Sequence, residues 1–172
     1  MLNTLFSDKT IKPKDRTSAI ANFLLEEKIS VADLLLFAVA AKPPVKATCI
    51  EGIEFATQTK PELVDIKSFA LIVEALKDKE PRVKWESAKV IANTAKLHTS
   101  SLKPAISNLL DNTSNAGTVV RWSAATALAA IIQLQIPSFA ELENAAAALI
   151  LAEEKASIQK IYQKALKKKK GK

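Results

Sequence analysis

The chain has 172 residues, of which 48% are hydrophobic and 25% charged, the balance of a globular protein with one domain of ordinary size. It contains one cysteine, one histidine and three glycines. These numbers exclude a disulfide framework and a multidentate Cys/His zinc site, and they disfavour a Gly-rich phosphate-binding fold. The net charge of +7 comes from the C-terminal end, because eight lysines and no acids lie between Lys155 and Lys172.

The first residues and the apolar segments lack signals for export or membrane insertion. Residues 1–8 have neither the basic region nor the long apolar run of a secretory signal. The stretch from Val31 to Ala41 is too short to cross a bilayer. We therefore expect a cytoplasmic protein with no membrane contact. The lysine run predicts a flexible, solvated tail over residues 167–172, with weak, non-specific polyanion contact as its alternative role.

Seven prolines divide the chain into apolar segments with helical spacing, rich in alanine and leucine. Proline is tolerated in the first turn of a helix and not in its interior, so these positions predict helix starts. Ser138 followed by Glu141 predicts a capping box at one of them. No segment shows the alternation of a strand. The sequence therefore predicts an all-helical protein.

The expected helices form pairs along the chain. The first helices of the pairs are predicted over residues 14–27, 45–59, 82–97, 118–134 and 154–168. The second helices are predicted over residues 30–41, 62–78, 101–111 and 138–151. A two-helix unit cannot bury its apolar stripe alone, so neighbouring units must stack to form the core.

Comparison of the chain with itself reveals a repeat. The segment Val83–Trp85 (Val-Lys-Trp) recurs as Val120–Trp122 (Val-Arg-Trp), a shift of 37 residues. One step earlier, the Val-Lys pair that begins at Val45 precedes the first of these copies by 38 residues. Fixed-period self-similarity of this length is typical of helical repeat proteins.

The segment Pro81–Ala88 resembles the core pattern of HEAT repeats, in which a proline and a Val-Arg pair precede an Ala-rich helix. Thr118–Ala125 is similar but lacks the proline, and Pro44–Ala47 matches in its first residues only. The resemblance covers residues 43–134 well. It implies a HEAT/armadillo-type fold, a right-handed α–α superhelix of about four helix-pair repeats plus a final half-repeat, in a single domain over residues 1–166.

The resemblance also implies a function class. Such proteins are mostly scaffolds that bind other proteins along a concave ridge of second helices, so we expect a non-enzymatic protein without cofactor or metal. The polar residues of the expected second helices are mixed and slightly acidic, which fits a protein or peptide partner better than duplex DNA. They are Glu62, Asp65, Lys67, Glu74, Lys103, Ser107, Asn108, Glu141, Glu143 and Asn144.

Two tryptophans provide the candidate site. Trp85 and Trp122 fall on the border between the apolar and polar faces of their helices. Two exposed indoles would serve as a partner hot spot, whereas a pair packed between repeats would look the same in sequence. With the cations that flank them, they give a predicted partner-binding set of Trp85, Trp122, Lys84, Arg121 and Lys89.

A column of cations, one per repeat, runs through Lys46, Lys84 and Arg121. Such a column would track the phosphates of a nucleic acid. The alternative is structural: each cation bonds loop carbonyls or an acid in a neighbouring turn. We favour the structural interpretation, because the family resemblance alone accounts for this column.

The remaining reactive side chains have structural interpretations. Cys49 lies among isoleucines and is expected to be an inert core thiol, and His98 is expected at a helix end. Glu51 and Glu54 share a helix face, which we interpret as solvated rather than as an acid/base couple. No catalytic residue is predicted.

The leading hypothesis is therefore a scaffold that binds a protein or peptide along its short repeat surface. The alternative is a nucleic-acid-binding protein related in fold to the alkylpurine DNA glycosylases, whose basic and aromatic groove Lys84–Trp85 and Arg121–Trp122 superficially resemble. The nearly neutral charge of residues 1–154 and the absence of a Trp-Asp pairing suited to catalysis count against that alternative.

Overall fold

The computed structural model describes the backbone of residues 1–169 and the side chains up to Lys167, and within that part of the chain all regular structure is helical. The first helices of the pairs are α2 (Pro13–Leu25), α4 (Pro43–Thr59), α6 (Pro81–Thr94), α8 (Thr118–Gln133) and α10 (Ala156–Lys169). The second helices are α3 (Val31–Val39), α5 (Ile66–Ala75), α7 (Leu102–Asn112) and α9 (Glu141–Ala152). A short helix, α1 (Leu2–Ser7), precedes the first pair and was not predicted.

Three helices begin at prolines, as expected. Pro13, Pro43 and Pro81 occupy the first turns of α2, α4 and α6. Pro61 and Pro137 instead begin short 3₁₀ turns, η1 (Pro61–Leu63) and η4 (Pro137–Phe139), and two further such turns, η2 (Ala95–Leu97) and η3 (Thr99–Ser101), connect α6 to α7.

The predicted capping box is wrong. Ser138 lies inside η4, and α9 starts at Glu141 with Ala140 as its N-cap and no side-chain cap. Side-chain caps occur instead at Ser30, which accepts a hydrogen bond from the backbone N–H of Asp33, and at Asp65, which accepts one from that of Ser68.

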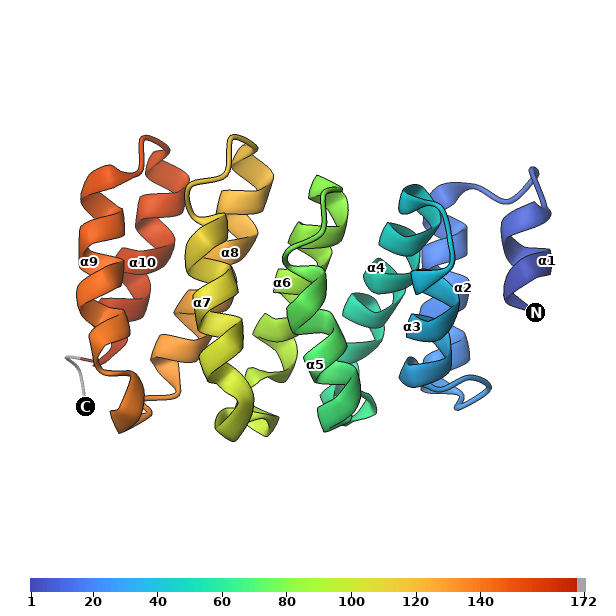
Figure 1. Ribbon diagram of the computed structural model, residues 1–172, viewed down its shortest axis with the longest axis horizontal. Helices are drawn as coiled ribbons and strands as arrows, with labels where there is room; N and C mark the ends of the chain where they lie inside the picture. The colour runs from blue at the N-terminus through green and yellow to red at the C-terminus, as the bar shows by residue number, and fades with distance from the viewer. Residues whose placement is uncertain (170–172) are drawn as a thin grey trace.

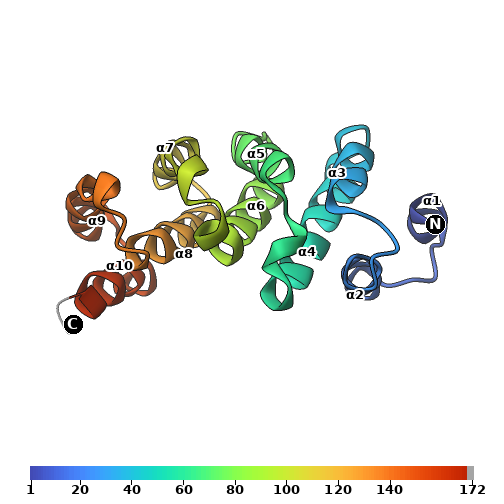
Figure 2. The same ribbon diagram turned by 90° about the horizontal axis from the view of Figure 1, so that it is seen from below.

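The helices form two parallel rows (Figure 1). The row of first helices, α2, α4, α6, α8 and α10, lies on the inner, concave side of a shallow arc, and the second helices lie on the outer side (Figure 2). This corrects the expectation that the second helices line the concave side. The reason is spacing: the first helices pack directly and extensively on one another, whereas α3, α5 and α7 touch only lightly, so the closer row lies inside the curve.

Small residues allow the first helices to pack this closely. Gly52 on α4 faces Ile20 on α2, and a Cβ added to Gly52 would lie 2.4 Å from Ile20 Cγ2. On α8, Ala124 and Ala125 are fully buried. Glycine in a helix interior costs about 1 kcal/mol relative to alanine, so its presence here reflects the close approach of the two helices.

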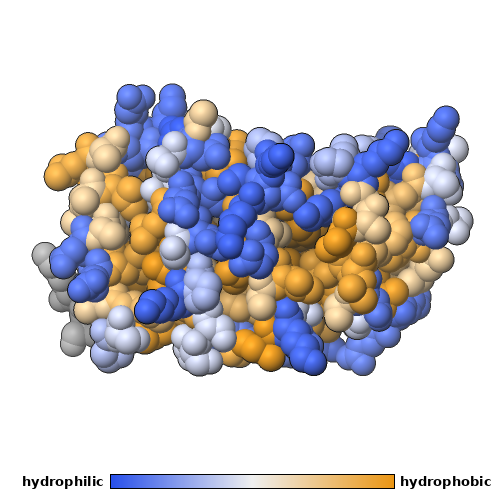
Figure 3. Space-filling view, viewed as in Figure 1, coloured by the Kyte–Doolittle hydropathy of each residue, from blue (hydrophilic) through white to orange (hydrophobic). Residues whose placement is uncertain are grey.

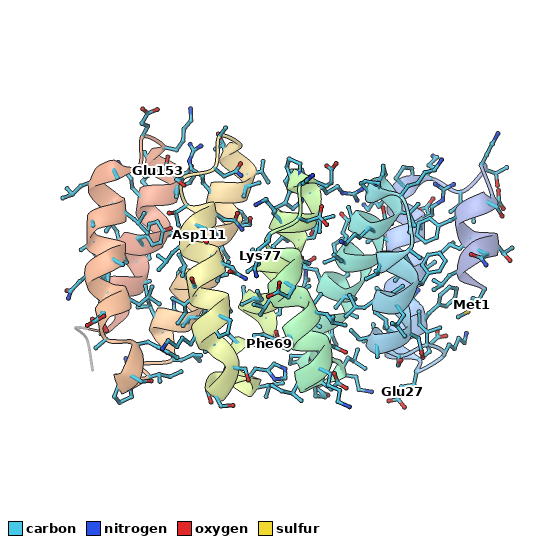
Figure 4. All side chains as sticks on the ribbon, in the orientation of Figure 1. Met1, Glu27, Phe69, Lys77, Asp111 and Glu153 are labelled. Atoms are coloured by element: carbon cyan, nitrogen blue, oxygen red, sulfur yellow. The ribbon has the colours of Figure 1, made fainter. Side chains whose placement is uncertain are left out.

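The core fills the space between the two rows and between neighbouring first helices. Cys49 is fully buried within it, and burial raises the pKa of its thiol to about 12, so it is the inert core thiol that was expected. His98 lies at a helix end, as predicted, but it is buried. Its ring stacks on Phe69, with 4.4 Å between centroids, and its Nε2 lies 2.9 Å from the carbonyl oxygen of Val64. Figure 4 labels Phe69 at this junction.

Both ends of the arc are closed by helices. At the N-terminal end α1 buries Leu5 and stacks Phe6 on Phe37 of α3, with 5.8 Å between ring centroids. At the other end α10 runs to Lys169; residues 170–172 of the expected tail lie outside the described residues, and the boundary between a domain over 1–166 and a flexible tail stays a prediction. None of the described helices is long and apolar enough to span a bilayer.

Candidate functional site

The cation column is bonded to the protein itself. Lys46 Nζ lies 2.6 Å from Asp78 Oδ2, and Lys84 Nζ donates to Asn112 Oδ1 at 2.9 Å. Burial opposes ionisation of Asp78, but the hydrogen bond and charge of Lys46, together with hydrogen bonds from the backbone of Glu80 and Lys79, keep the pKa of Asp78 below its ordinary value. Lys46 thus ties α4 to the turn after α5, as the structural interpretation predicted, and Lys84 ties α6 to the last residue of α7 through an amide rather than an acid.

Arg121 makes the most extensive of these contacts. Its Nε and Nη2 donate to the two carboxylate oxygens of Glu153 at 2.9 and 3.2 Å, and its Nη1 donates to the carbonyl of Asn115 at 2.9 Å. Hydrogen bonds from Arg121 hold the pKa of Glu153 below its usual range. Glu153 lies in the loop between α9 and α10 (Figure 4), so this pair ties α8 to the last two helices.

A charged cluster fills the inner side of the α4–α6 contact. Glu54 and Glu86 are only 3% and 4% exposed, and Lys89 Nζ lies 3.2 and 3.0 Å from their Oε2 atoms. This corrects the interpretation of Glu54 as part of a solvated face. Trp85 joins the cluster, because its Nε1 donates to Glu86 Oε1 at 2.7 Å.

The ionisation of the cluster follows from burial and pairing. Burial raises the pKa of Glu86 above its ordinary value despite the hydrogen bonds from Lys89 and Trp85. Burial by itself would lower the pKa of Lys89, but the hydrogen bonds and charges of Glu86 and Glu54 together raise it, so the amine stays protonated. The burial of Glu54 and Glu86 therefore depends on the positive charge of Lys89, and the protonated state of Lys89 depends on the two acids.

Glu51 is also engaged by its neighbours. Its Oε2 accepts hydrogen bonds from Arg82 Nη2 on α6 and from Thr17 Oγ1 on α2, both at 2.6 Å. This contact links three successive first helices through one carboxylate. Glu51 therefore contributes to packing, which corrects its interpretation as a solvated residue.

The inner side is open at the α8–α10 contact, where Trp122 stands one repeat after Trp85. Trp122 is 41% exposed and stands in a groove of about 590 Å³ between α8 and α10. Ser123 occupies the position next to Trp122 that Glu86 occupies next to Trp85, and its hydroxyl donates to the backbone carbonyls of Val119 and Val120. The groove is lined by Trp122, Thr126, Ala129, Ala130, Gln133, Ile161, Lys164 and Lys167.

The five predicted site residues thus occupy two different settings. Trp85, Lys84, Lys89 and Arg121 are bonded to other side chains of the protein, and Trp122 lies in the groove. Among the described residues the two tryptophans make no ring contact with each other. Lys164 and Lys167 were not predicted as site residues, because Lys164 was given no role within the predicted helix over 154–168 and Lys167 was assigned to the tail. Their helical spacing from Ile161 was the signal that places them on one helix face.

Comparison with known proteins identifies the fold. No protein-family model matches the sequence, and the search of curated proteins finds no relative. Among solved structures, a designed armadillo repeat protein in complex with the peptide (KR)4 matches with a TM-score of 0.75 and 21% identity, over 96% of this chain and 79% of that one. A computationally designed armadillo repeat protein for modular peptide recognition matches with a TM-score of 0.72 and 21% identity, over 90% of this chain and 74% of that one. The chain therefore has the fold of an armadillo/HEAT-type repeat solenoid.

Proposed function

We propose that the protein is a non-enzymatic scaffold that binds a peptide or protein partner on its inner surface, the surface formed by α2, α4, α6, α8 and α10. The observation that carries this proposal is the open α8–α10 groove with the exposed indole of Trp122. Tryptophans in such positions dominate binding energy at interfaces. Because the residues that line the groove lie on packed helices, they lose little conformational freedom when a partner binds.

The structural neighbours support the same proposal. One of them is a designed repeat protein bound to a peptide, and another was designed for peptide recognition. Their likeness to this chain concerns the fold, so peptide binding is carried over as a proposal. Of the five predicted site residues, we propose Trp122 as a direct contact and assign to Trp85, Lys84, Lys89 and Arg121 the role of holding the inner surface in shape.

The nucleic-acid alternative has less support. The cations that would follow a phosphate backbone, Lys84 and Arg121, are already bonded to Asn112 and Glu153. The inner side of α4–α6 also carries three glutamates against two cations, Arg82 and Lys89. Nucleic-acid binding surfaces are instead strongly and continuously basic. The cytoplasmic location and the polyanion contact of the tail stay predictions.

Selection from a random peptide display library against the full chain tests the proposal. Binding of the selected peptides is then measured by fluorescence anisotropy for wild type, Trp122→Ala and Leu36→Ala. Leu36 is the matched control, because it is 68% exposed on α3, where Figure 3 shows hydrophobic outer surface. We expect Trp122→Ala to weaken binding at least about tenfold, and Leu36→Ala to leave it unchanged. Binding that survives Trp122→Ala, or that is lost with Leu36→Ala, would contradict the proposal.

A further inference from the structure

The α8–α10 groove combines an apolar floor with one-sided positive charge. Ala129 and Ala130 are small and leave room beside the indole of Trp122, and Ile161 closes the far side on α10. Lys164 and Lys167 lie on the same side of α10, about 4.5 Å apart along the helix axis, since they are three residues apart. The groove therefore offers space for a bulky apolar side chain with cations on one side.

The positive charge of this groove is uncompensated. Neither α8 nor α10 contains an aspartate or glutamate in the part of the chain that the structure describes. The two groove lysines, Lys164 and Lys167, form no hydrogen bond or ion pair with the side chains that the structure describes. Of the two acids in the α9–α10 loop, Glu153 is already bound by Arg121, and Glu154 forms no ion pair with Lys164 or Lys167. The groove differs in this respect from α4–α6, where Lys89 is paired twice.

The helix dipole does not account for both lysines. Cations near the C-terminus of a helix are stabilised by the dipole, but the effect is confined to the last turn. Lys167 lies in the last turn of α10, which ends at Lys169, whereas Lys164 lies before it. Neither an ion pair with a described side chain nor the helix dipole therefore accounts for the position of Lys164 beside Trp122.

We propose that this groove selects acidic peptides: a large apolar or aromatic side chain of the partner packs against Trp122, and flanking carboxylates pair with Lys164 and Lys167. The inference rests on the proposed function and names the class of partner. Charge complementarity identifies the carboxylates, and the alanine floor with the exposed indole identifies the apolar residue. Lysine suits this task, because its flexible stem accepts carboxylates at somewhat different positions.

A peptide fits these observations better than a nucleic acid. Single-stranded nucleic acids need cations that follow the backbone across several helices. On the neighbouring helices α6 and α8, Lys84 and Arg121 are held by Asn112 and Glu153. The free cations of the groove lie on α10 alone, which suits a short acidic segment.

The test uses fluorescein-labelled synthetic peptides of equal length and fluorescence anisotropy with the full chain. The first peptide has a central phenylalanine flanked by glutamates and aspartates. The second has alanine in place of the phenylalanine, and the third has lysines in place of the acids. Single-stranded DNA of matching length is the fourth probe. We expect the first peptide to bind at least about tenfold more tightly than the other three.

Two charge-reversal variants separate the groove from the lysine run as a whole. Lys164→Glu changes the groove, and Lys160→Glu makes the same change at an exposed position of α10 outside the groove lining. We expect Lys164→Glu and Trp122→Ala each to weaken binding of the acidic peptide about tenfold, and Lys160→Glu to weaken its binding far less. Circular dichroism of each variant verifies that the helices remain folded.

Each of the other possible results would contradict the inference, and each shows which part of it fails. Equal losses for Lys160→Glu and Lys164→Glu would assign the binding to the lysine run as a generic polycation. Tighter binding of the basic peptide, lost with Trp122→Ala, would contradict the acidic class while leaving the proposed function standing. Tighter binding of the DNA, lost with Trp122→Ala, would overturn both. If none of the probes binds, the acidic class fails and the library selection decides the proposed function separately.

Discussion

Two contacts on the inner surface, α4–α6 and α8–α10, differ in how they use the residues beside their tryptophans. At α4–α6, Trp85 donates to a buried Glu86, and Lys89 pairs with Glu86 and Glu54. At α8–α10, Ser123 stands where the first contact has Glu86, and Trp122 is left exposed beside unpaired lysines. A glutamate and a lysine, Glu86 and Lys89, bond together beside Trp85, whereas Ser123 and Thr126 occupy the matching positions of α8, where Trp122 is exposed.

The largest expected effect comes from removing the cation of the closed contact. Lys89→Met leaves two glutamates buried without a counter-charge, which should lower the free energy of unfolding by about 3–5 kcal/mol. Urea denaturation at pH 7 measures it. The matched change Lys164→Met in the open groove should stay within about 0.5 kcal/mol, because Lys164 is exposed. Similar losses for both variants would remove the distinction between the two contacts.

A smaller loss of stability is expected at the ion pair of Arg121 with Glu153, which ties α8 to the loop between α9 and α10. Glu153→Gln weakens the bidentate pair with Arg121 and should cost about 1.5–3 kcal/mol at pH 7. Arg121 lowers the pKa of Glu153, so the ionised acid stabilises the fold above the ordinary value of 4.5. That contribution is lost as the pH falls through the lowered pKa.

The difference in unfolding free energy between wild type and Glu153→Gln should therefore shrink as the pH drops below 4.5. Glu154→Gln is the control, because Glu154 is exposed and its variant should resemble wild type at every pH. A pH-independent difference would mean that Glu153 acts through packing rather than through charge.

The smallest expected effect is the difference in unfolding free energy between the two tryptophan variants. Trp85→Ala removes a donor to buried Glu86, and Trp122→Ala removes a more exposed ring. We expect Trp85→Ala to be the more destabilising by about 1–2 kcal/mol in thermal or urea unfolding. If Trp122→Ala costs as much, its indole contributes to packing and the groove loses its distinct role.

The sequence predicted the repeat and most of the helices, because prolines and helical periodicity act locally. It missed α1, since the six residues of Leu2–Ser7 are too few for a periodic pattern and are held by contacts with α3. It also placed the second helices on the concave side. Which row is inner depends on how closely the helices pack, as at Gly52 and Ile20, and that distance is a tertiary property.

The site was predicted less completely, for the same reason. Glu54 appeared solvated because Lys89, the cation that allows its burial, lies 35 positions further along the chain. The two tryptophans looked equivalent because their settings on the helix are alike. The contacts of Glu86 with Trp85 and Lys89, and the exposure of Trp122 in the α8–α10 groove, distinguish them.

The indole N–H signals of the two tryptophans test the central claim most directly. The chain contains only these two, so a ¹H–¹⁵N spectrum of the full protein shows one signal for each, assigned with Trp85→Phe and Trp122→Phe. Titration with the acidic, phenylalanine-containing peptide should shift the Trp122 signal progressively and leave that of Trp85 in place. A shift of Trp85 with Trp122 unmoved, or equal shifts of both, would contradict the division between a closed α4–α6 contact and an open α8–α10 groove.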